Sequence, residues 1–240
     1  MKNLSIIVVM ISLTACGQKT ITAQKMTPES YEKQSKLDKR LIPKYGHQEK
    51  TTREKKADEK FIRDMLDHYN GDKRIASDYF INGGFYFLYQ DKFDTAMFRF
   101  NQAYLLDSTN TDIYWGYGGF FYSLGDFEQA KEQYEEGLAI DSTNTHLLTD
   151  LGLYYKKKYI DLHSTDSVSA LMKLEMAIGY FVKSYEIDPN YSNTLINLST
   201  CYLSMNDCNN AWRYHDECKA TEKRAVSDNY TEHLKKHCNR

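Results

Sequence analysis

Four of the five cysteines lie in the carboxyl-terminal part of the chain, as Cys201, Cys208, Cys218 and Cys238. In an exported protein, an even cluster of thiols indicates disulfide chemistry. Cys208 begins one predicted helix and Cys238 ends the next, at nearly equal distances from a turn near residues 221–226. Because the two helices run antiparallel, we predict a Cys208–Cys238 disulfide, whose long closed loop stabilises the fold. We expect the other two cysteines to remain buried thiols.

Histidines beside these cysteines suggest metal binding as an alternative. His215 and Cys218 are three residues apart, and His233 and His237 are four apart, next to Cys238. Such spacings place ligands on one face of a helix, as in zinc sites. However, His215 and Cys218 occupy positions that point into a helical core, so a structural role is favoured. We predict no metal and no cofactor.

A five-residue segment recurs without change, and this recurrence predicts the elements that position these side chains. Asp107–Thr111 returns as Asp141–Thr145, 34 residues later. Small and aromatic residues recur at the same offset, in the pairs Gly84 and Gly118, Ala96 and Ala130, Phe93 and Phe127, and Phe100 and Tyr134. A period in the thirties with small residues at fixed positions predicts a stacked array of helical hairpins.

The pattern resembles the tetratricopeptide repeat family. The resemblance implies an all-α fold, a right-handed superhelical array of about four hairpins with a capping helix at each end. The expected repeats are 77–110, 111–144, 145–191 and 192–225, and the expected capping helices are 53–76 and 226–240. The third repeat is 13 residues longer than the others. We predict two overlong helices there, joined near residues 163–166; a neutral length variant is the alternative.

The amino terminus resembles that of a bacterial lipoprotein. After Lys2, an apolar run from Leu4 to Leu13 is too short for a permanent membrane span. Leu13-Thr14-Ala15-Cys16 then resembles a lipobox, so we predict a signal peptide at 1–15 and a lipid anchor on Cys16. The residue after Cys16 is Gly17, which favours the outer membrane of a cell envelope. An ordinary secretory signal with a coincidental cysteine is the alternative.

Charge separates the segment after the lipobox from the array. Residues 17–60 carry a net charge of +5, and residues 61–240 carry −8. Since 16–52 has few apolar residues, we predict a flexible tether there, which either contacts anionic lipid headgroups or is a solvated spacer. An acidic, exported domain makes nucleic acid an improbable partner.

An aromatic-rich set on the first helices of the first two repeats is the predicted partner-binding groove: Ile81, Phe85, Tyr89, Trp115 and Tyr122. Aromatic residues are typical anchors of recognition surfaces. The alternative is that this set packs against the amino-terminal capping helix. Because the chain lacks nucleophile, phosphate-loop and metal-helix motifs, we expect no enzyme. We predict a lipid-anchored envelope scaffold that binds a protein or extended peptide, with a carbohydrate-binding surface lipoprotein as the alternative.

Overall fold

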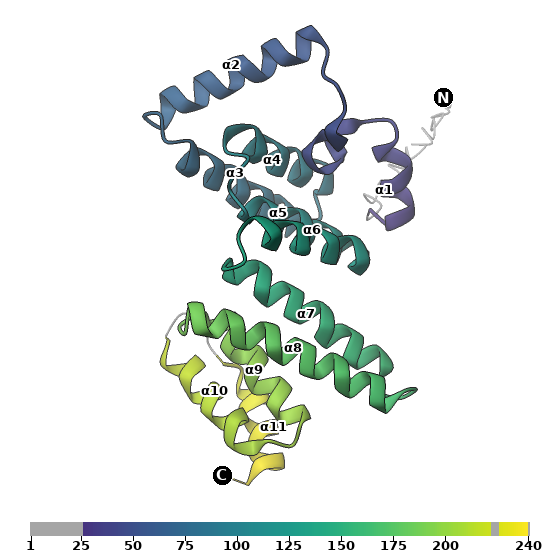
Figure 1. Cartoon of the computed structure of the whole chain (residues 1–240), viewed down its shortest axis with the longest axis vertical. Helices are drawn as coiled ribbons and strands as arrows, with labels where there is room; N and C mark the ends of the chain where they lie inside the picture. Colours follow the sequence, from purple (N-terminus) through teal and green to yellow (C-terminus); the bar gives the residue numbers. More distant parts are fainter. Residues whose placement is uncertain (1–25, 222–225, 240) are drawn as a thin grey trace, which may run out of the picture.

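The computed structural model describes residues 26–221 and 226–239, and every regular element in these ranges is a helix. Eight helices form four antiparallel hairpins stacked along the long axis of the molecule (Figure 1). They are α3 (Lys73–Leu88) with α4 (Phe93–Leu106), α5 (Asp112–Leu124) with α6 (Phe127–Ile140), α7 (Thr145–Leu162) with α8 (Ser167–Ile187), and α9 (Ser192–Ser204) with α10 (Cys208–Ala220). The predicted all-α array of four hairpins is therefore confirmed.

Two predicted segments lie outside the described residues, namely the signal peptide 1–15 and Cys16. Within the described ranges, no helix is both long and apolar enough to cross a bilayer.

The recurring pentapeptide forms the same hydrogen-bonded turn at both of its positions. The Asp107 carboxylate accepts from the Thr109 backbone N–H at 3.1 Å and from its hydroxyl at 2.6 Å. Asp141 accepts from Thr143 in the same way, at 2.9 and 2.6 Å. The recurrence in sequence thus reflects a recurring connection between hairpins, built from an aspartate that satisfies the backbone of the turn.

The asparagine of this segment ties each turn to the preceding hairpin. Asn110 donates to Asp78 at 2.7 Å, and Asn144 donates to Asp112 at 2.8 Å. Asn144 also caps α7 by accepting from the Leu147 N–H. Each asparagine therefore fixes the start of one helix against the start of the helix one repeat earlier.

Small residues in the first helix of each of the first three hairpins admit an aromatic ring from the second helix. A Cβ atom would lie 2.3 Å from Phe100 at Gly84, 2.0 Å from Tyr134 at Gly118 and 2.6 Å from Phe181 at Gly152. No side chain fits at such distances, so glycine lets the two helices approach closely. The rings are fully buried, which places the core along the interior of the stack.

The fourth hairpin replaces this arrangement by polar contacts. Ser199 stands in the small position and donates to the Ala211 carbonyl at 2.7 Å. His215 stands in the ring position with 2% exposure, and its Nε2 lies 3.0 Å from the Thr231 hydroxyl. Thr231 belongs to α11 (Asp228–Cys238), which covers the end of the array. The polar residues are tolerated because the last helix supplies their partners.

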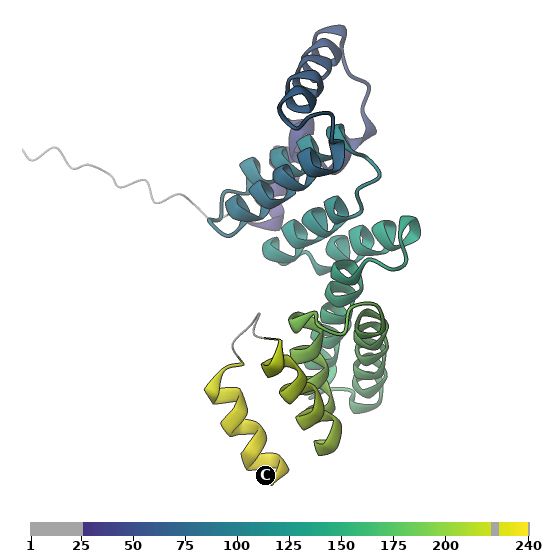
Figure 2. The same ribbon diagram turned by 90° about the vertical axis from the view of Figure 1, so that its left-hand side faces the viewer.

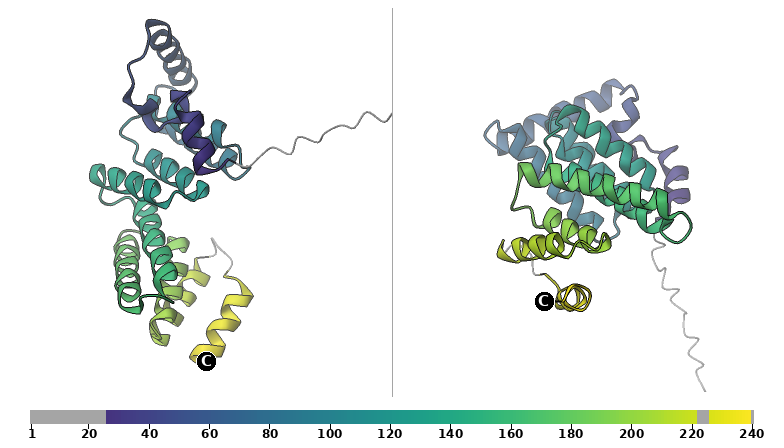
Figure 3. Two further views of the ribbon diagram at one scale, coloured as in Figure 1. Left: turned by 90° about the vertical axis from the view of Figure 1, so that its right-hand side faces the viewer. Right: turned by 60° about the horizontal axis from the view of Figure 1, so that its bottom comes forward.

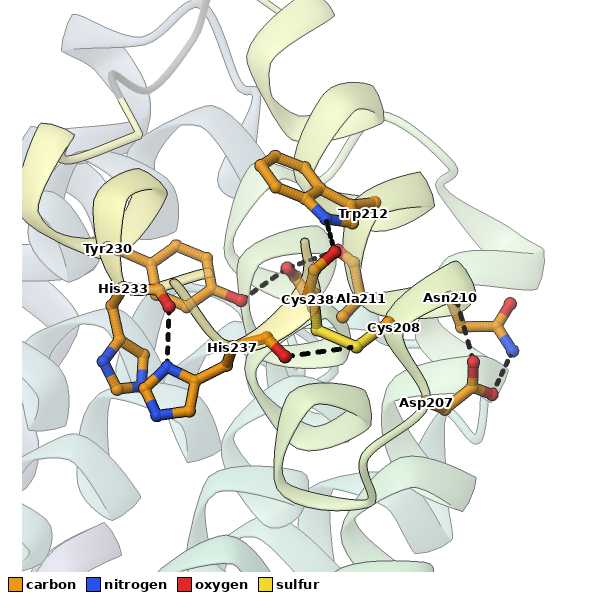
Figure 4. Close-up of a disulfide and its surroundings, with 10 residues drawn as sticks. Asp207, Cys208, Asn210, Ala211, Trp212, Tyr230, His233, His237 and Cys238 are labelled. Atoms are coloured by element: carbon orange, nitrogen blue, oxygen red, sulfur yellow. Dashed lines mark hydrogen bonds between the residues drawn. A yellow bond between two sulfur atoms is a disulfide. The ribbon is translucent and has the colours of Figure 1, made fainter. Parts of the chain in front are cut away.

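The predicted bridge is present: the Cys208 and Cys238 Sγ atoms are bonded, with Cα atoms 5.3 Å apart. Figure 4 shows the bridge joining the start of α10 to the end of α11, with the Trp212 indole donating to the Cys238 carbonyl. Cys201 and Cys218 are fully buried thiols, as expected. In Figure 2, α11 lies alongside α10 at the carboxyl end of the stack.

The third hairpin has the predicted shape. Its helices contain 18 and 21 residues and meet at residues 163–166. Asp166 starts α8 by accepting from the Ser169 N–H at 3.0 Å. The joined tips of α7 and α8 extend past the neighbouring hairpins, toward the lower right of Figure 1. The extra residues therefore lengthen two helices, and no long loop is formed.

The prediction of a flexible tether at 16–52 is wrong for residues 26–52, the part that the structure describes. Residues 26–51 form α1 (Pro28–Ser35) and two 3-10 helices, η1 (Lys39–Leu41) and η2 (Pro43–His47), which lie against the first two hairpins (Figure 3). Tyr31 and Leu41 are 6% and 5% exposed. The Tyr31 ring meets the edges of Phe120 and Phe121 at 5.3 and 5.5 Å.

A buried asparagine explains how so polar a segment packs. The Asn101 side chain donates to the carbonyls of Arg40 and Ile42 at 2.8 and 3.0 Å. It accepts from the Lys44 N–H at 2.9 Å and the Tyr117 hydroxyl at 2.7 Å. One side chain thus satisfies the backbone of a tight left-handed turn, in which Lys44 has φ 54°.

The predicted amino-terminal capping helix 53–76 is divided between two elements. Its main part is α2 (Thr52–His68), and residues 73–76 form the first turn of α3. Phe61 of α2 meets Phe80 of α3 at 5.3 Å between ring centroids. The helix has no buried residue and projects from the end of the stack, at the top of Figure 1. Gly71, at φ 82°, makes the turn between the helices.

Candidate functional site

A pocket of about 200 Å³ opens on the side of the array formed by the first helices of the hairpins. Its walls come from α3, α5, α7 and the start of α9, with Tyr134 of α6 behind them, so it spans all four repeats. The side chains that shape it are Phe85, Tyr89, Trp115, Tyr122, Asp150 and Tyr191.

The pocket contains four of the five residues predicted for the groove. The exception is Ile81, which is 3% exposed and packs in the main core, so its place in the predicted groove is wrong. An aliphatic side chain at that turn of α3 gains more from burial than a solvent-facing position would allow. No residue of α2 is among the described residues that line the pocket.

Trp115 is held in place at the back of the pocket. Its ring stacks on His146 with centroids 4.2 Å apart, and the Phe85 ring is tilted against it, also with centroids 4.2 Å apart. Its indole N–H donates to Asp150 Oδ2 at 3.0 Å. His146 is itself oriented by Asp112, whose Oδ1 lies 3.0 Å from Nδ1. The indole is thus preorganised and loses little freedom when a ligand binds.

Two tyrosines form the accessible rim of the pocket. Tyr89 is 84% exposed, and Tyr122 is 37% exposed with its ring against the edge of Phe127. Gly119 lies three residues before Tyr122 on α5, and a Cβ atom there would stand 3.2 Å from Phe85. A ligand would therefore meet the tyrosine rings first and the half-buried rings of Phe85 and Trp115 below them.

Asp150 brings a charge to the floor of this aromatic surface. Burial raises the pKa of the Asp150 carboxyl to about 6, although the Trp115 hydrogen bond, His146 and the Tyr134 hydroxyl each favour the ionised form. Perturbed carboxyl groups in a pocket are candidates for functional residues. The sequence prediction did not single out Asp150; the available signal was an acidic residue inside the apolar stretch from Leu147 to Leu153.

A polar patch follows the pocket along the array. Lys156 of α7 donates to Asn197 Oδ1 at 2.9 Å and to the Thr200 hydroxyl at 2.7 Å, both on α9. Burial lowers the pKa of the Lys156 ammonium, which still keeps two neutral oxygen partners. The first helices thus present aromatic residues over three repeats and polar residues toward the fourth.

The histidines named for a metal serve other contacts. His215 lies between Asp216 and Thr231, and the rings of His233 and His237 are 4.2 Å apart on α11. In residues 26–221 and 226–239, no three histidine, cysteine or acidic side chains are grouped closely enough to hold a metal ion.

Comparison with known proteins found similarity only among solved structures: no protein-family model and no curated protein matches the chain. Pseudomonas aeruginosa PilF is 19% identical, with 68% of this chain and 85% of that chain covered and a TM-score of 0.36. PilW, described as a type IV pilus biogenesis factor, is 13% identical over 67% and 85%, with a TM-score of 0.36. YrrB, described as a TPR protein with an unusual peptide-binding site, is 19% identical over 73% and 97%, with a TM-score of 0.32.

The assignment of the fold rests on the geometry of the chain itself. Its hairpins repeat every 34 residues over the first two units, with the same turn bonds and the same glycine–ring contacts in each. These repeated helical hairpins are consistent with the tetratricopeptide repeat family that the sequence resembles.

Proposed function

We propose that this protein is a scaffold of the bacterial cell envelope, anchored by lipid at Cys16, which binds a protein or extended peptide in the aromatic pocket. The observation that carries the proposal is the exposure of Tyr89, at 84%, beside a preorganised Trp115. A large aromatic side chain on the rim of a pocket has no role in the core and is a typical anchor for a partner.

The size and place of the pocket favour an extended partner. A volume of about 200 Å³ accommodates a side chain and not a folded domain. The first helices of successive hairpins continue on either side of it, so a peptide backbone can run along them while one residue enters the pocket. The binding mode is then that of a preformed concave surface that receives an ordered segment.

The lipid anchor would hold the array close to its membrane. The first described helix, α1, begins at Pro28, twelve positions after Cys16. Twelve residues span at most about 40 Å when fully extended. A partner would therefore be bound near the membrane surface, a setting that suits an assembly or export apparatus of the envelope.

Displayed peptides and arrayed glycans test the proposal on the full chain. We expect selection from a random peptide library to yield a consensus whose binding is lost in Trp115→Ala and kept in Glu132→Gln, a change on the exposed side of α6. Glycan binding that depends on Trp115, without any peptide consensus, would replace the scaffold by the carbohydrate-binding alternative.

A further inference from the structure

The pocket combines several aromatic rings with a single charged group. Among the described residues that line it, Asp150 is the one acidic side chain, and no lysine or arginine is present. Four tyrosines also line the pocket: Tyr89 and Tyr122 on the rim, the half-buried Tyr191 at the start of α9, and the fully buried Tyr134 of α6. The described lining of the pocket is therefore mainly aromatic and apolar, and its single charged side chain is acidic.

We infer that the pocket receives the cationic side chain of an arginine or lysine in a protein partner. This inference rests on the proposed function, because it names the chemistry of the residue that enters the pocket. The carboxylate of Asp150 binds the guanidinium or ammonium group, and the surrounding rings contact its flat face and its methylene stem.

The physical basis is the complementarity of charge and of ring electrostatics. The negative faces of Trp and Tyr rings attract a cation, and the attraction grows when water is excluded. The Trp115 N–H and the Tyr134 hydroxyl each use one lone pair of the Asp150 carboxylate, which offers about four such sites. A neutral side chain in the same place would cover a carboxylate and leave it without a counter-charge, which is costly.

The titratable neighbours of Asp150 leave its negative charge available to a ligand. His146 is hydrogen-bonded to Asp112, and the Tyr134 and Tyr191 hydroxyls have their pKa values raised by burial. The ammonium of Lys157 is bound by Asp161 and lies 5.1 Å from the Phe127 ring. These groups come from α5, α6, α7 and the start of α9, and the Lys157 ammonium is already paired with Asp161.

Cation binding should be coupled to a proton. Because burial raises the pKa of Asp150 to about 6, part of the free protein carries a neutral Asp150 below that pH. A bound cation favours the ionised form, so its affinity should rise between pH 5 and pH 7 and then level off. A neutral ligand gains nothing from ionisation of Asp150, so its affinity should not rise in this range.

Fluorine NMR on the full chain in detergent micelles tests the inference directly. The chain has two tryptophans, Trp115 and Trp212, so 5-fluorotryptophan gives two signals, and Trp212→Phe assigns them. The probes are the peptides Gly-Ser-Arg-Ser-Gly and Gly-Ser-citrulline-Ser-Gly, which differ only in the charge of one side chain. We expect the arginine peptide to shift the Trp115 signal saturably and to bind roughly ten-fold more tightly than the citrulline peptide.

The variant Asp150→Asn keeps an acceptor for the indole N–H and removes the charge. In it we expect the two peptides to bind equally and the rise in affinity between pH 5 and pH 7 to vanish, whereas His146→Gln retains the preference for arginine. Equal binding by the unaltered protein, or stronger binding of tetramethylammonium chloride than of the arginine peptide, would overturn the inference. If neutral peptides from the library selection shift the Trp115 fluorine signal, the proposed function stands and the preference for a cation is refuted. If no peptide ligand is found at all, the proposed function itself is contradicted.

Discussion

Asp150 shows how one buried carboxyl group connects stability with binding. Its carboxylate orients Trp115 through a 3.0 Å hydrogen bond, yet burial disfavours its charge. Sites that bind charged ligands commonly retain such a cost in the free protein. The sequence predicted the pocket's rings because large aromatic residues recur on the first helices, but one acidic residue among many carries no such signal. Its role depends on Phe85 and Tyr134, which come from other repeats.

The raised pKa of Asp150 predicts a pH-dependent stability. Its folded pKa of about 6 lies above the ordinary value of 3.8, so the folded state holds more protons between these values, and stability falls as pH rises through that range. Asp150→Asn removes this loss, so its free energy of unfolding relative to the unaltered protein should rise by on the order of 2 kcal/mol between pH 4 and pH 7. Urea unfolding of both proteins at pH 4 and pH 7 measures this difference in unfolding free energy, and the same measurement on His146→Gln separates the contribution of the histidine. A difference that is the same at both pH values would contradict the prediction.

The glycine–ring contacts predict opposite effects for two glycines on helices. Gly118→Ala places a Cβ 2.0 Å from Tyr134, so it should cost about 1–3 kcal/mol of stability through overpacking. Gly179→Ala is the matched control, because that exposed position on α8 has no atom near its Cβ. There alanine should stabilise by about 0.5–1 kcal/mol. Thermal unfolding measures the change in stability of the two variants. An equal loss of stability at both positions would contradict the explanation by packing.

At the scale of the elements, the sequence predicted the hairpins well and the amino-terminal segment poorly. The hairpins follow from apolar and small residues at helical spacing, which a single chain displays directly. Residues 26–51 have few apolar side chains, and their attachment depends on backbone groups that Asn101 satisfies from 57 or more positions away. Local composition cannot report a long-range hydrogen bond of this kind. The same reason hid Tyr191, which reaches the pocket only through the stacking of α9 on α7.

The hydrogen bonds of Asn101 predict that replacing this residue unfolds the amino-terminal segment locally. Asn101→Leu removes the side-chain partner of the Arg40 and Ile42 carbonyls, each of which costs about 1–3 kcal/mol when buried and unpaired. It also removes one of the two acceptors of the Lys44 N–H, which keeps the Tyr117 hydroxyl at 3.1 Å. Residues 38–47 should then lose hydrogen-exchange protection while the hairpins keep theirs. Asn82→Leu, at an exposed position of α3, is the control and should leave the segment protected. Retained protection of 38–47 in Asn101→Leu would show that apolar contacts such as Tyr31 suffice.

The disulfide predicts how the last helix responds to reduction. The bridge closes a loop of 30 residues between α10 and α11, so its loss should cost about 3 kcal/mol. We expect the double change Cys208→Ser, Cys238→Ser to release α11 and to expose Leu234, which is fully buried. Hydrogen exchange of α11 with and without dithiothreitol provides the measurement. An effect of dithiothreitol that persists in the double variant would assign the stabilisation to another group.

At the scale of the whole molecule, the protein is an elongated stack with its two ends differently closed. The amino end carries a projecting α2, and the carboxyl end is sealed by α11 and a disulfide (Figure 1). The pocket lies between these ends, on the first helices. The proposed anchor at Cys16 and the folded segment from Pro28 would together hold this pocket within a short reach of the membrane. Cys16→Ser should accordingly move the protein from the membrane fraction to the soluble fraction of lysed cells.

Photo-crosslinking in intact cells tests the central claim, that the partner binds on the first helices at the aromatic pocket. A photoreactive amino acid is placed singly at Tyr89 on the rim and at Glu132 on the outer side of α6, both exposed. We predict that Tyr89 yields one dominant protein adduct, that Trp115→Ala abolishes it, and that Glu132 yields none. Adducts of the same protein from Glu132 alone, or from both positions regardless of Trp115, would contradict the account.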